Sequence, residues 1–238
     1  MLTRTAATNV GLVRPINEDS YICLATDVYV VADGMGGHAA GEVASGMLVE
    51  TAGELLCHAG SDAFSEDSLK QVILQANQKI LDKASQDKGY AGMGTTASIL
   101  HIKDDAGILA HVGDSRIYLF RSGEMQQLTK DHSLVWDLVE NGTITAEEAK
   151  QHPKRNLLTR AVGVDRELQV DVHTFPVEHD DKFLLCSDGL TNMVSENDIK
   201  AAVLAPAISN KAQYLIDLAL RAGGTDNITA IVVEKSHA

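Results

Sequence analysis

The sequence has little of what several protein classes require. Its three cysteines, Cys23, Cys57 and Cys186, are odd in number, widely spaced and set in apolar surroundings. This pattern excludes a disulfide framework and indicates reduced thiols in a cytoplasmic protein. No apolar run approaches the roughly 18 residues that a membrane-spanning helix needs, and the N-terminus lacks the apolar segment of a signal peptide. Neither export nor a membrane anchor is therefore expected.

Basic side chains are also in the minority. Lys and Arg number 20 against 33 Asp and Glu, so the formal net charge is −13. A nucleic acid or an anionic membrane would have to bind against this average field, and we expect neither as a partner. Apolar residues make up 45% of the chain, which excludes a disordered protein and is ample for a sizeable core.

The predicted elements come in groups. Runs typical of strands lie at residues 20–25, 28–32, 95–102, 108–112, 116–120, 125–128, 168–173, 182–186 and 228–234. Apolar residues recur at helical spacing in residues 39–58, 67–86, 134–140, 145–151, 196–204 and 211–221. Grouped strands and helix pairs favour antiparallel sheets covered by helices, an α+β domain, over a doubly wound parallel sheet.

Two parts of this pattern lead to more specific expectations. The four short strands between residues 95 and 128 predict an antiparallel meander. Residues 131–163 are polar and form short helical turns, so we expect an appended flap there. The whole chain, residues 1–238, is expected to form one domain.

Carboxylates mark the ends of several predicted strands. Asp33, Asp114 and Asp188 each follow an apolar strand next to a glycine, and Asp226 directly precedes the last strand. If these ends converge, each pair of like charges about 4 Å apart costs roughly 4 kcal/mol at an effective dielectric near 20, so a cation is needed. Oxygen ligands alone favour Mg²⁺ or Mn²⁺ over zinc. A single Asp-Gly pair at a strand end is usually an ordinary turn, but four carboxylates at strand ends together with the glycine-rich segment after Asp33 favour a metal site.

Residues 33–42 form a glycine-rich connection from a buried strand to a helix. The segment lacks the lysine and the following Ser or Thr of a phosphate-binding P-loop, and its glycine spacing is not that of a dinucleotide site. Its glycines more plausibly hold a sharp bend that offers Asp33 and the Gly34 carbonyl to a metal ion.

Arg14 lies shortly before the first predicted strand, close to the acidic residues Glu18 and Asp19. The planar guanidinium of Arg14 suits capture of a phosphate group. The alternative is a surface salt bridge from Arg14 to Glu18 or Asp19.

Six segments together resemble the metal-dependent Ser/Thr protein phosphatases of the PPM family, the type 2C phosphatases, and specifically their compact bacterial members. They appear in the family's order and span most of the chain. The segments are residues 14–19 (RPINED), 31–38 (VADGMGGH), 93–96 (MGTT), 111–116 (HVGDSR), 187–190 (SDGL) and 224–229 (GTDNIT).

The resemblance implies a four-layer α-β-β-α sandwich of two antiparallel sheets flanked by helix pairs, with a small flap. It also implies two core Mn²⁺ or Mg²⁺ ions and a weaker third. In this likeness Asp33 bridges the core ions, the Gly34 carbonyl completes one of them, and Asp188 and Asp226 hold the other. The remaining expected ligands are Glu18 and Asp19, acting mostly through metal-bound waters, and Asp114 at the third ion.

The same resemblance implies hydrolysis of phosphoserine and phosphothreonine on proteins by a metal-bridging hydroxide, with Arg14 orienting the phosphate and no covalent phosphoenzyme. Animal members have a histidine after the Asp-Gly pair, where this chain has Met35. The general acid is therefore open: His38 is nearest in sequence, a metal-bound water is the simplest substitute, and His111 and His132 are structural candidates.

The expected partners are phosphorylated proteins and a cognate Ser/Thr kinase that the enzyme opposes, with the protein a monomer in the cytoplasm. Four basic residues of the flap could contact an acidic substrate surface or form a solvated helix face: Lys150, Lys154, Arg155 and Arg160. Two alternative functions stay open. One is a pseudophosphatase that only docks phosphoproteins, and the other is a phosphatase of small metabolites or of a partner-switching regulator.

Overall fold

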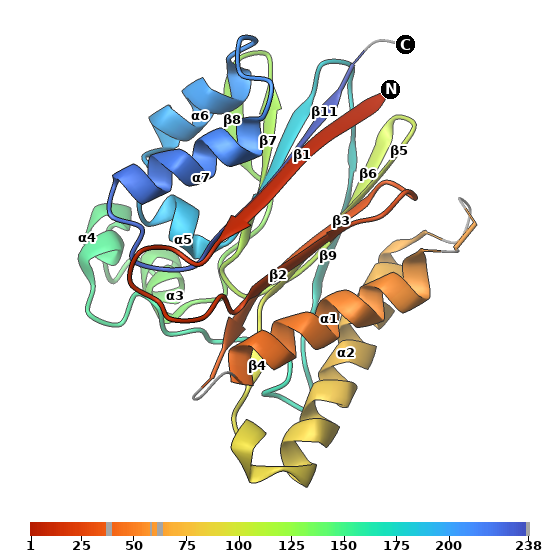
Figure 1. Cartoon of the computed structure of the whole chain (residues 1–238), viewed down its shortest axis with the longest axis vertical. Helices are drawn as coiled ribbons and strands as arrows, with labels where there is room; N and C mark the ends of the chain where they lie inside the picture. Colours follow the sequence, from red (N-terminus) through yellow and green to blue (C-terminus); the bar gives the residue numbers. More distant parts are fainter. Residues whose placement is uncertain (37–39, 58, 61–63, 237–238) are drawn as a thin grey trace.

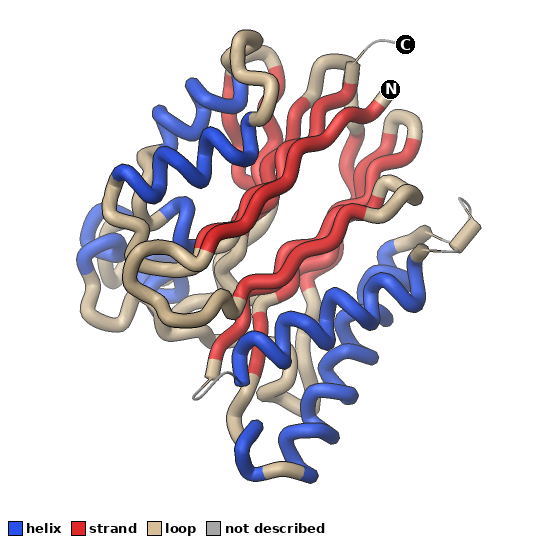
Figure 2. Tube along the Cα trace, viewed as in Figure 1, coloured by secondary structure: helices blue, strands red, loops and turns tan. Residues whose placement is uncertain are grey.

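The structure is a computed structural model that describes residues 1–36, 40–57, 59–60 and 64–236. Two antiparallel sheets lie face to face and helices cover the outer face of each (Figures 1 and 2). This is the four-layer α-β-β-α arrangement that the sequence predicts. His38 lies outside the described residues.

Sheet A, as we name it, joins both ends of the chain. In order across the sheet its strands are β1 (Leu2–Asn9), β11 (Ile228–Lys235), β10 (Lys182–Cys186), β7 (Arg116–Arg121) and β8 (Glu124–Gln127). The first and last strands pair along their whole length, which brings the two termini together (Figure 1).

Sheet B carries the first predicted hairpin. In order its strands are β2 (Asp19–Cys23), β3 (Val28–Met35), β5 (Ala97–Lys103), β6 (Ala106–Val112) and β9 (Asp171–Pro176), and the short β4 (Gly94–Thr95) pairs with the end of β3. All the strand pairs in both sheets are antiparallel.

The helices fall into two packing groups and a flap. Sheet B is covered by α1 (Ala40–Leu56) and α2 (Glu66–Gln86), and sheet A by α5 (Asp188–Thr191), α6 (Glu196–Leu204) and α7 (Lys211–Arg221). Two short helices, α3 (Leu134–Glu140) and α4 (Ala146–Gln151), form the flap, and a 3₁₀ turn, η2 (Lys88–Tyr90), follows α2. Figure 1 shows the α1–α2 pair and the α6–α7 pair on opposite sides of the sandwich.

Both faces of each sheet are buried, which explains why the strands are continuous apolar runs. Along β3, Val28 and Val30 face the helices whereas Tyr29 and Val31 face the other sheet. Alternate side chains of an extended strand point to opposite faces, so such a strand must be apolar at every position. The core therefore has three layers of packing: one between the sheets and one under each helix group.

The predicted meander is wrong. After β6 the chain leaves sheet B and enters sheet A, where β7 pairs with β10 and β8. The change of sheet occurs at Gly113, whose φ of 108° lies in a region that glycine adopts at little cost. Residues 95–128 thus form two hairpins in different sheets, and Asp114 lies at the crossing between them.

Three further boundaries differ from the prediction. Strand β1 was not expected, because its residues are mostly Thr and Ala; it is held by pairing with the apolar β11. Strand β9 begins at Asp171 rather than at residue 168. Strand β3 continues through Asp33 and Gly34 to Met35, because β4 pairs with this extension.

Two expectations about the chemistry of the chain can be compared with the structure directly. Cys23, Cys57 and Cys186 are all free thiols. A search of the described residues finds no helix that combines the length and the apolar character needed to cross a bilayer.

Candidate active site

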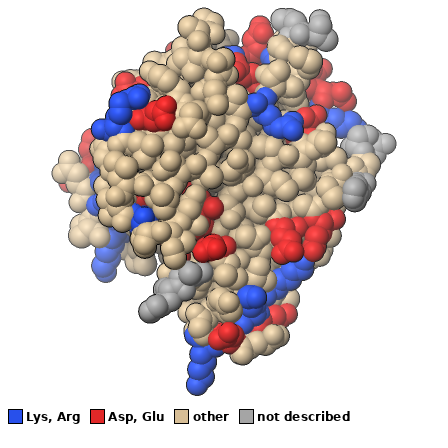
Figure 3. All heavy atoms as spheres, in the orientation of Figure 1, with Lys and Arg blue, Asp and Glu red and all other residues tan. Residues whose placement is uncertain are grey.

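A cleft of about 190 Å³ brings together side chains that are distant in the sequence. It lies at the end of the sandwich where β3 ends and where α5 and β11 begin. On the face shown in Figure 3, Asp and Glu side chains, drawn in red, are visible between the two halves of the molecule. Seven of the predicted site residues line the cleft: Arg14, Glu18, Asp33, Gly34, Asp114, Asp188 and Asp226.

Asp33 is held in place through its backbone. Its N–H donates to Thr96 Oγ1 at 2.9 Å, and its carbonyl accepts from Thr95 Oγ1 at 3.0 Å. Thr96 in turn shares a 2.7 Å hydrogen bond with Ser115 in the crossing between the sheets. The hydroxyl groups of the two threonines thereby hold the backbone at Asp33, which carries the carboxylate of the cleft.

Gly34 permits a close approach of three chain segments. A Cβ atom at this position would lie 2.1 Å from the Gly41 carbonyl oxygen and 2.6 Å from that of Glu18. Both contacts are with backbone atoms, so no side-chain rearrangement could relieve them. The Gly34 N–H donates to the Glu18 carbonyl at 3.1 Å. Glycine is thus required here for packing, beside any role of its own carbonyl.

Asp19 lies beneath the cleft and is almost fully buried. One carboxylate oxygen, Oδ2, accepts from Ser187 Oγ at 2.7 Å and from Thr229 Oγ1 at 2.6 Å. The other, Oδ1, is buried without a hydrogen-bond partner. Burial raises the pKa of Asp19 to about 7, although the two hydroxyl groups act in the opposite direction. The free oxygen is a buried acceptor that an ordered water on an ion could satisfy.

The other carboxylates repel one another across the cleft. Asp33 and Asp188 come within hydrogen-bonding reach of each other. Burial and then the charge of Asp226 raise the pKa of Asp188 to about 6, while Asn192 donates to its Oδ2 at 3.0 Å. Burial and the neighbouring carboxylates also raise the pKa values of Asp33 and Asp114 well above their usual range. Among the described residues, Arg14 pairs with Asp226, whereas Asp33, Asp114 and Asp188 form no ion pair with a lysine or arginine.

Arg14 pairs with Asp226, and not with the two acidic residues that the sequence suggested for a salt bridge. Arg14 Nη2 donates to Asp226 Oδ2 at 2.8 Å, and 46% of the arginine side chain is exposed. This bond raises the pKa of Arg14. Glu18 lines the same cleft, and Asp19 is buried in its own network.

Asn227 is a functional residue that the sequence interpretation missed. Its Oδ1 accepts the Glu18 N–H at 2.8 Å, and its Nδ2 donates to the carbonyls of Val10 and Ile16, each at 2.9 Å. One amide side chain thereby ties the loop that carries Arg14 to the start of β11. Its position directly after Asp226 was the available signal.

The donor set fits hydrated divalent ions. Within the described residues no three His, Cys, Asp or Glu side chains form a closed group that could hold an ion on their own. Mg²⁺ does not need such a cage, because it commonly keeps several waters and takes only one or two carboxylates from the protein. Oxygen-only donors, raised carboxyl pKa values and the unpartnered Asp19 Oδ1 all suit a hard cation with ordered water.

His111 and His132 have structural roles. His111 is fully buried, accepts from Ser98 at Nδ1 and approaches the Gly113 and Lys130 carbonyls through Nε2; burial lowers its pKa to about 4. The nitrogen facing two carbonyls must carry the proton. His132 Nδ1 accepts the Gly113 N–H at 3.1 Å, so Nε2 carries its proton and faces a carboxylate of β9.

The basic residues of the flap have different surroundings. Arg160 donates to Asp171 at 2.9 Å and so anchors the end of the flap to β9. Lys150 and Arg155 line a second pocket, of about 340 Å³, which lies under the flap and shares Asp114 and Asp188 with the cleft.

Comparison with known proteins identifies the family. A family model described as protein phosphatase 2C matches residues 17–221. The chain belongs to the protein phosphatase 2C family. It is 42% identical over 237 residues to the protein phosphatase PhpP of Streptococcus pneumoniae, a match that covers 97% of this chain and 96% of that protein.

Solved structures agree with this membership in the 2C family. The serine/threonine phosphatase PstP/Ppp of Mycobacterium tuberculosis superposes with a TM-score of 0.93 at 38% identity, covering 99% of both chains. The catalytic domain of PstP in complex with two manganese ions superposes with a TM-score of 0.91 at 37% identity, again covering 99% of both chains. The predicted family and fold are confirmed; the roles of the individual site residues stay predictions.

Proposed function

We propose that this protein hydrolyses phosphoserine and phosphothreonine on proteins in a reaction that depends on Mn²⁺ or Mg²⁺. The observation that carries the proposal is the convergence of Asp33, Asp188 and Asp226 in one cleft beside Arg14, in a chain of the 2C phosphatase family. Bound divalent ions supply activation of water and neutralisation of phosphoryl charge. The relative whose structure contains two manganese ions supports the choice of metal.

The cleft residues divide between the proposed ions by position. Asp33, with the Gly34 carbonyl beside it, would be the ligand shared by the two ions, and Asp188 and Asp226 would hold the second ion. Glu18 and Asp19 act through ordered water, for which the unpartnered Asp19 Oδ1 is suited. A third, weaker ion would lie between Asp114 and Asp188 at the opening to the flap pocket.

Arg14 orients the phosphate group. One of its N–H groups is engaged by Asp226, and the half-exposed guanidinium keeps further donors for a phosphoryl oxygen at the mouth of the cleft. A guanidinium group that is already hydrogen-bonded to a carboxylate loses less conformational freedom when it binds an anion. The proton donor to the leaving serine or threonine stays unassigned, and His38 is our candidate because His111 and His132 are engaged elsewhere.

We further propose that residues 1–238 act as a single catalytic domain with residues 131–163 as its flap. Its partners would be phosphorylated proteins, with a cognate Ser/Thr kinase making the phosphorylations that it removes. A cytoplasmic monomer is consistent with three free thiols and with a strong net negative charge.

Two substrates separate catalysis from docking. A phosphothreonine peptide and para-nitrophenyl phosphate should both be hydrolysed after addition of Mn²⁺, and chelation by EDTA should remove the activity. Binding of the phosphopeptide without metal-dependent turnover of either substrate would instead favour the pseudophosphatase. Turnover of the aryl phosphate but of no phosphoprotein in a kinase-treated extract would favour a small-metabolite phosphatase.

A further inference from the structure

The loop between β1 and β2, which carries Arg14, exposes large apolar side chains beside the catalytic cleft (Figure 1). The exposed fractions of Leu12, Val13 and Ile16 are 67%, 66% and 40%. A single exposed apolar residue is ordinary on a protein surface. Three of them between residues 12 and 16 concentrate apolar surface at one place, which is typical of an interaction site. We call these three side chains the apolar patch.

The backbone that carries the apolar patch is fixed. The Leu12 N–H donates to the Gly224 carbonyl at 2.7 Å, and the Ile16 carbonyl accepts from Asn227 Nδ2 at 2.9 Å. A Cβ atom on Gly224 would lie 3.2 Å from Leu12 Cγ, so the Leu12 side chain lies against the turn that leads to Asp226. Apolar surface that an ordered loop holds in water contributes nothing to folding, whereas it gains free energy when a partner covers it.

The position of the apolar patch indicates which partner covers it. The cleft has a volume of only about 190 Å³, and Arg14 lines it directly after Val13 in the chain. In the proposed reaction Arg14 orients the phosphate group. The residues next to the phosphorylated side chain of a protein substrate must therefore lie outside the cleft, beside this loop. Two apolar side chains, Met35 and Leu158, line the cleft itself.

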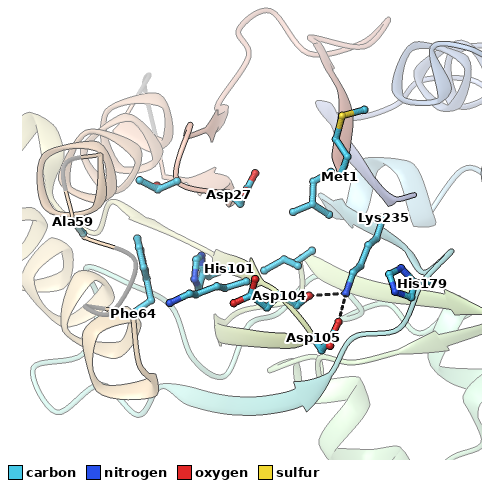
Figure 4. Close-up of a pocket in the computed structure, with 13 residues that line it drawn as sticks. Met1, Asp27, Ala59, Phe64, His101, Asp104, Asp105, His179 and Lys235 are labelled. Carbon is cyan, nitrogen blue, oxygen red and sulfur yellow. Dashed lines mark hydrogen bonds and ion pairs between the residues drawn. The ribbon is translucent and has the colours of Figure 1, made fainter. Parts of the chain in front are cut away.

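The opposite end of the sandwich has a different character. A cavity of about 650 Å³ lies there, lined by Asp27 just before β3 begins (Figure 4). Lys235 donates to the Asp104 carbonyl at 2.5 Å and to Asp105 Oδ1 at 2.8 Å, as the dashed lines show. Lys103 lines the same cavity, so its walls carry charges of both signs. This mixture gives no preference for a cation or an anion, whereas the apolar patch favours a partner of definite chemistry.

We propose that the apolar patch binds a large apolar side chain adjacent to the phosphorylated residue of the substrate. The enzyme then favours phosphoserine and phosphothreonine sites that are flanked by residues such as leucine or isoleucine. Leu12 and Val13 contact the flanking side chain while Arg14 holds the phosphate, and burial of apolar surface supplies the preference. The inference rests on the proposed phosphatase function and adds a class of substrate to it.

Matched phosphopeptides test this preference. Two phosphothreonine peptides of equal net charge carry either leucine or serine on both sides of the phosphothreonine, and para-nitrophenyl phosphate serves as a substrate without flanking residues. With the full chain and saturating Mn²⁺, kcat/KM for the leucine peptide should exceed that for the serine peptide by about tenfold. Equal values for the two peptides would overturn the proposal.

Variants locate the preference on the loop. Leu12→Ser combined with Val13→Ser should reduce the advantage of the leucine peptide to about twofold or less, with kcat/KM for para-nitrophenyl phosphate within about twofold of the parental value. The thermal midpoint should not change, because both side chains are exposed. Leu55→Ser removes an exposed apolar side chain near the end of α1 and should leave the advantage intact.

Two results with these variants would contradict the assignment. One is an undiminished advantage of the leucine peptide in the double variant, which would place the preference elsewhere. The other is an equal loss of activity on para-nitrophenyl phosphate, which would mean that the loop acts only by holding Arg14.

Binding separates this inference from the proposed function. If neither peptide nor para-nitrophenyl phosphate is hydrolysed, the phosphatase function fails, and the dissociation constants of the two fluorescein-labelled peptides then test the apolar patch. Binding of the leucine peptide that is about tenfold tighter, and that depends on Leu12 and Val13, would support the patch as a docking surface. Equal dissociation constants would overturn the patch together with the function.

Discussion

Buried carboxylates occur in two settings in this protein. Away from the cleft, Asp181 is fully buried and accepts from Arg121 at both oxygens, at 2.8 and 2.6 Å. Arg116 donates in the same bidentate way to both carboxylate oxygens of Asp131. In the cleft, Asp33 and its neighbours face one another, and the guanidinium of Arg14 is bound to Asp226 at the rim.

The difference separates residues that stabilise the fold from residues that destabilise it. An arginine fork compensates the lost hydration of a buried carboxylate, and removing one partner of such a pair is costly. Asp33, Asp114 and Asp188 lack an arginine fork of this kind and have raised pKa values, which means that folding holds their charges together at a cost. That cost is the reason for expecting an affinity for divalent cations.

The largest expected effect follows from removing the shared cleft carboxylate. Asp33→Asn should lower kcat/KM for a phosphopeptide by at least about a hundredfold, because it removes a ligand without changing side-chain volume. The same variant should unfold at an equal or higher temperature than the parent in EDTA, since one repelling charge is gone. Mg²⁺ should raise the thermal midpoint of the parent and not that of the variant. Parental activity in Asp33→Asn would refute its role as the bridging ligand.

The corresponding Asp→Asn substitution in a carboxylate that is paired with an arginine should have the opposite outcome. Asp181→Asn replaces the buried carboxylate that accepts two bonds from Arg121 with a neutral amide, while the more exposed Glu178 still pairs with Arg121. The substitution should lower the free energy of unfolding by about 2–3 kcal/mol. Activity per folded molecule should stay at the parental level, because Asp181 and Asp188 lie beyond opposite ends of β10. Urea unfolding measures the first quantity, with Asp165→Asn as the surface control. A stable but inactive Asp181→Asn protein would remove the distinction between the two sets.

A smaller effect is expected at the edge of the cleft. Asp114 joins the cleft to the flap pocket, and in our proposal it holds only the weaker third ion. Asp114→Ala should therefore slow turnover by about tenfold while leaving the Mg²⁺-induced rise in thermal midpoint nearly intact. Unchanged turnover would show that a third ion is dispensable. Loss of the metal-induced stabilisation would show that Asp114 is a ligand of the two core ions.

The cleft set was predictable from sequence because each member carries a local signal. Asp33, Asp114 and Asp188 all follow an apolar strand and adjoin a glycine, and those segments match a family pattern in order. The Asp181–Arg121 pair carries no such local signal in the sequence. The two residues are 60 positions apart and meet only because β7 and β10 are neighbours in sheet A. Sequence periodicity does not report which strands become neighbours.

The same limit explains the errors in the fold. The meander was expected because consecutive strands usually pair, and the single turn at Gly113 that redirects β7 to sheet A has no distinctive composition. The cavity at the opposite end is a further case. Asp27 and Asp104 are ordinary turn residues in the sequence, and only the fold shows that they face one cavity.

The smallest expected effect is a pH dependence of the free energy of unfolding that comes from the cleft carboxylates and not from the arginine-paired ones. Raised carboxyl pKa values mean that the folded protein binds more protons than the unfolded chain, so the metal-free protein should become more stable as the pH falls through those values. Burial raises the pKa of Asp19 to about 7, so its contribution falls within the interval from pH 8 to pH 6.5. Three buried histidines, His101, His111 and His132, have lowered pKa values and contribute in the opposite direction over the same interval, so the parent is compared with Asp19→Asn.

Between pH 8 and pH 6.5 the free energy of unfolding in EDTA should therefore rise in the parent, relative to Asp19→Asn, by somewhat under ~1 kcal/mol. Asp181→Asn should lower stability equally at both pH values. Saturating Mg²⁺ should remove the difference between the parent and Asp19→Asn, since a bound cation favours the ionised carboxylates over protonation. An equal pH dependence of the metal-free parent and of Asp19→Asn would mean that the cleft charges are compensated in a way that the carboxylate contacts do not reveal.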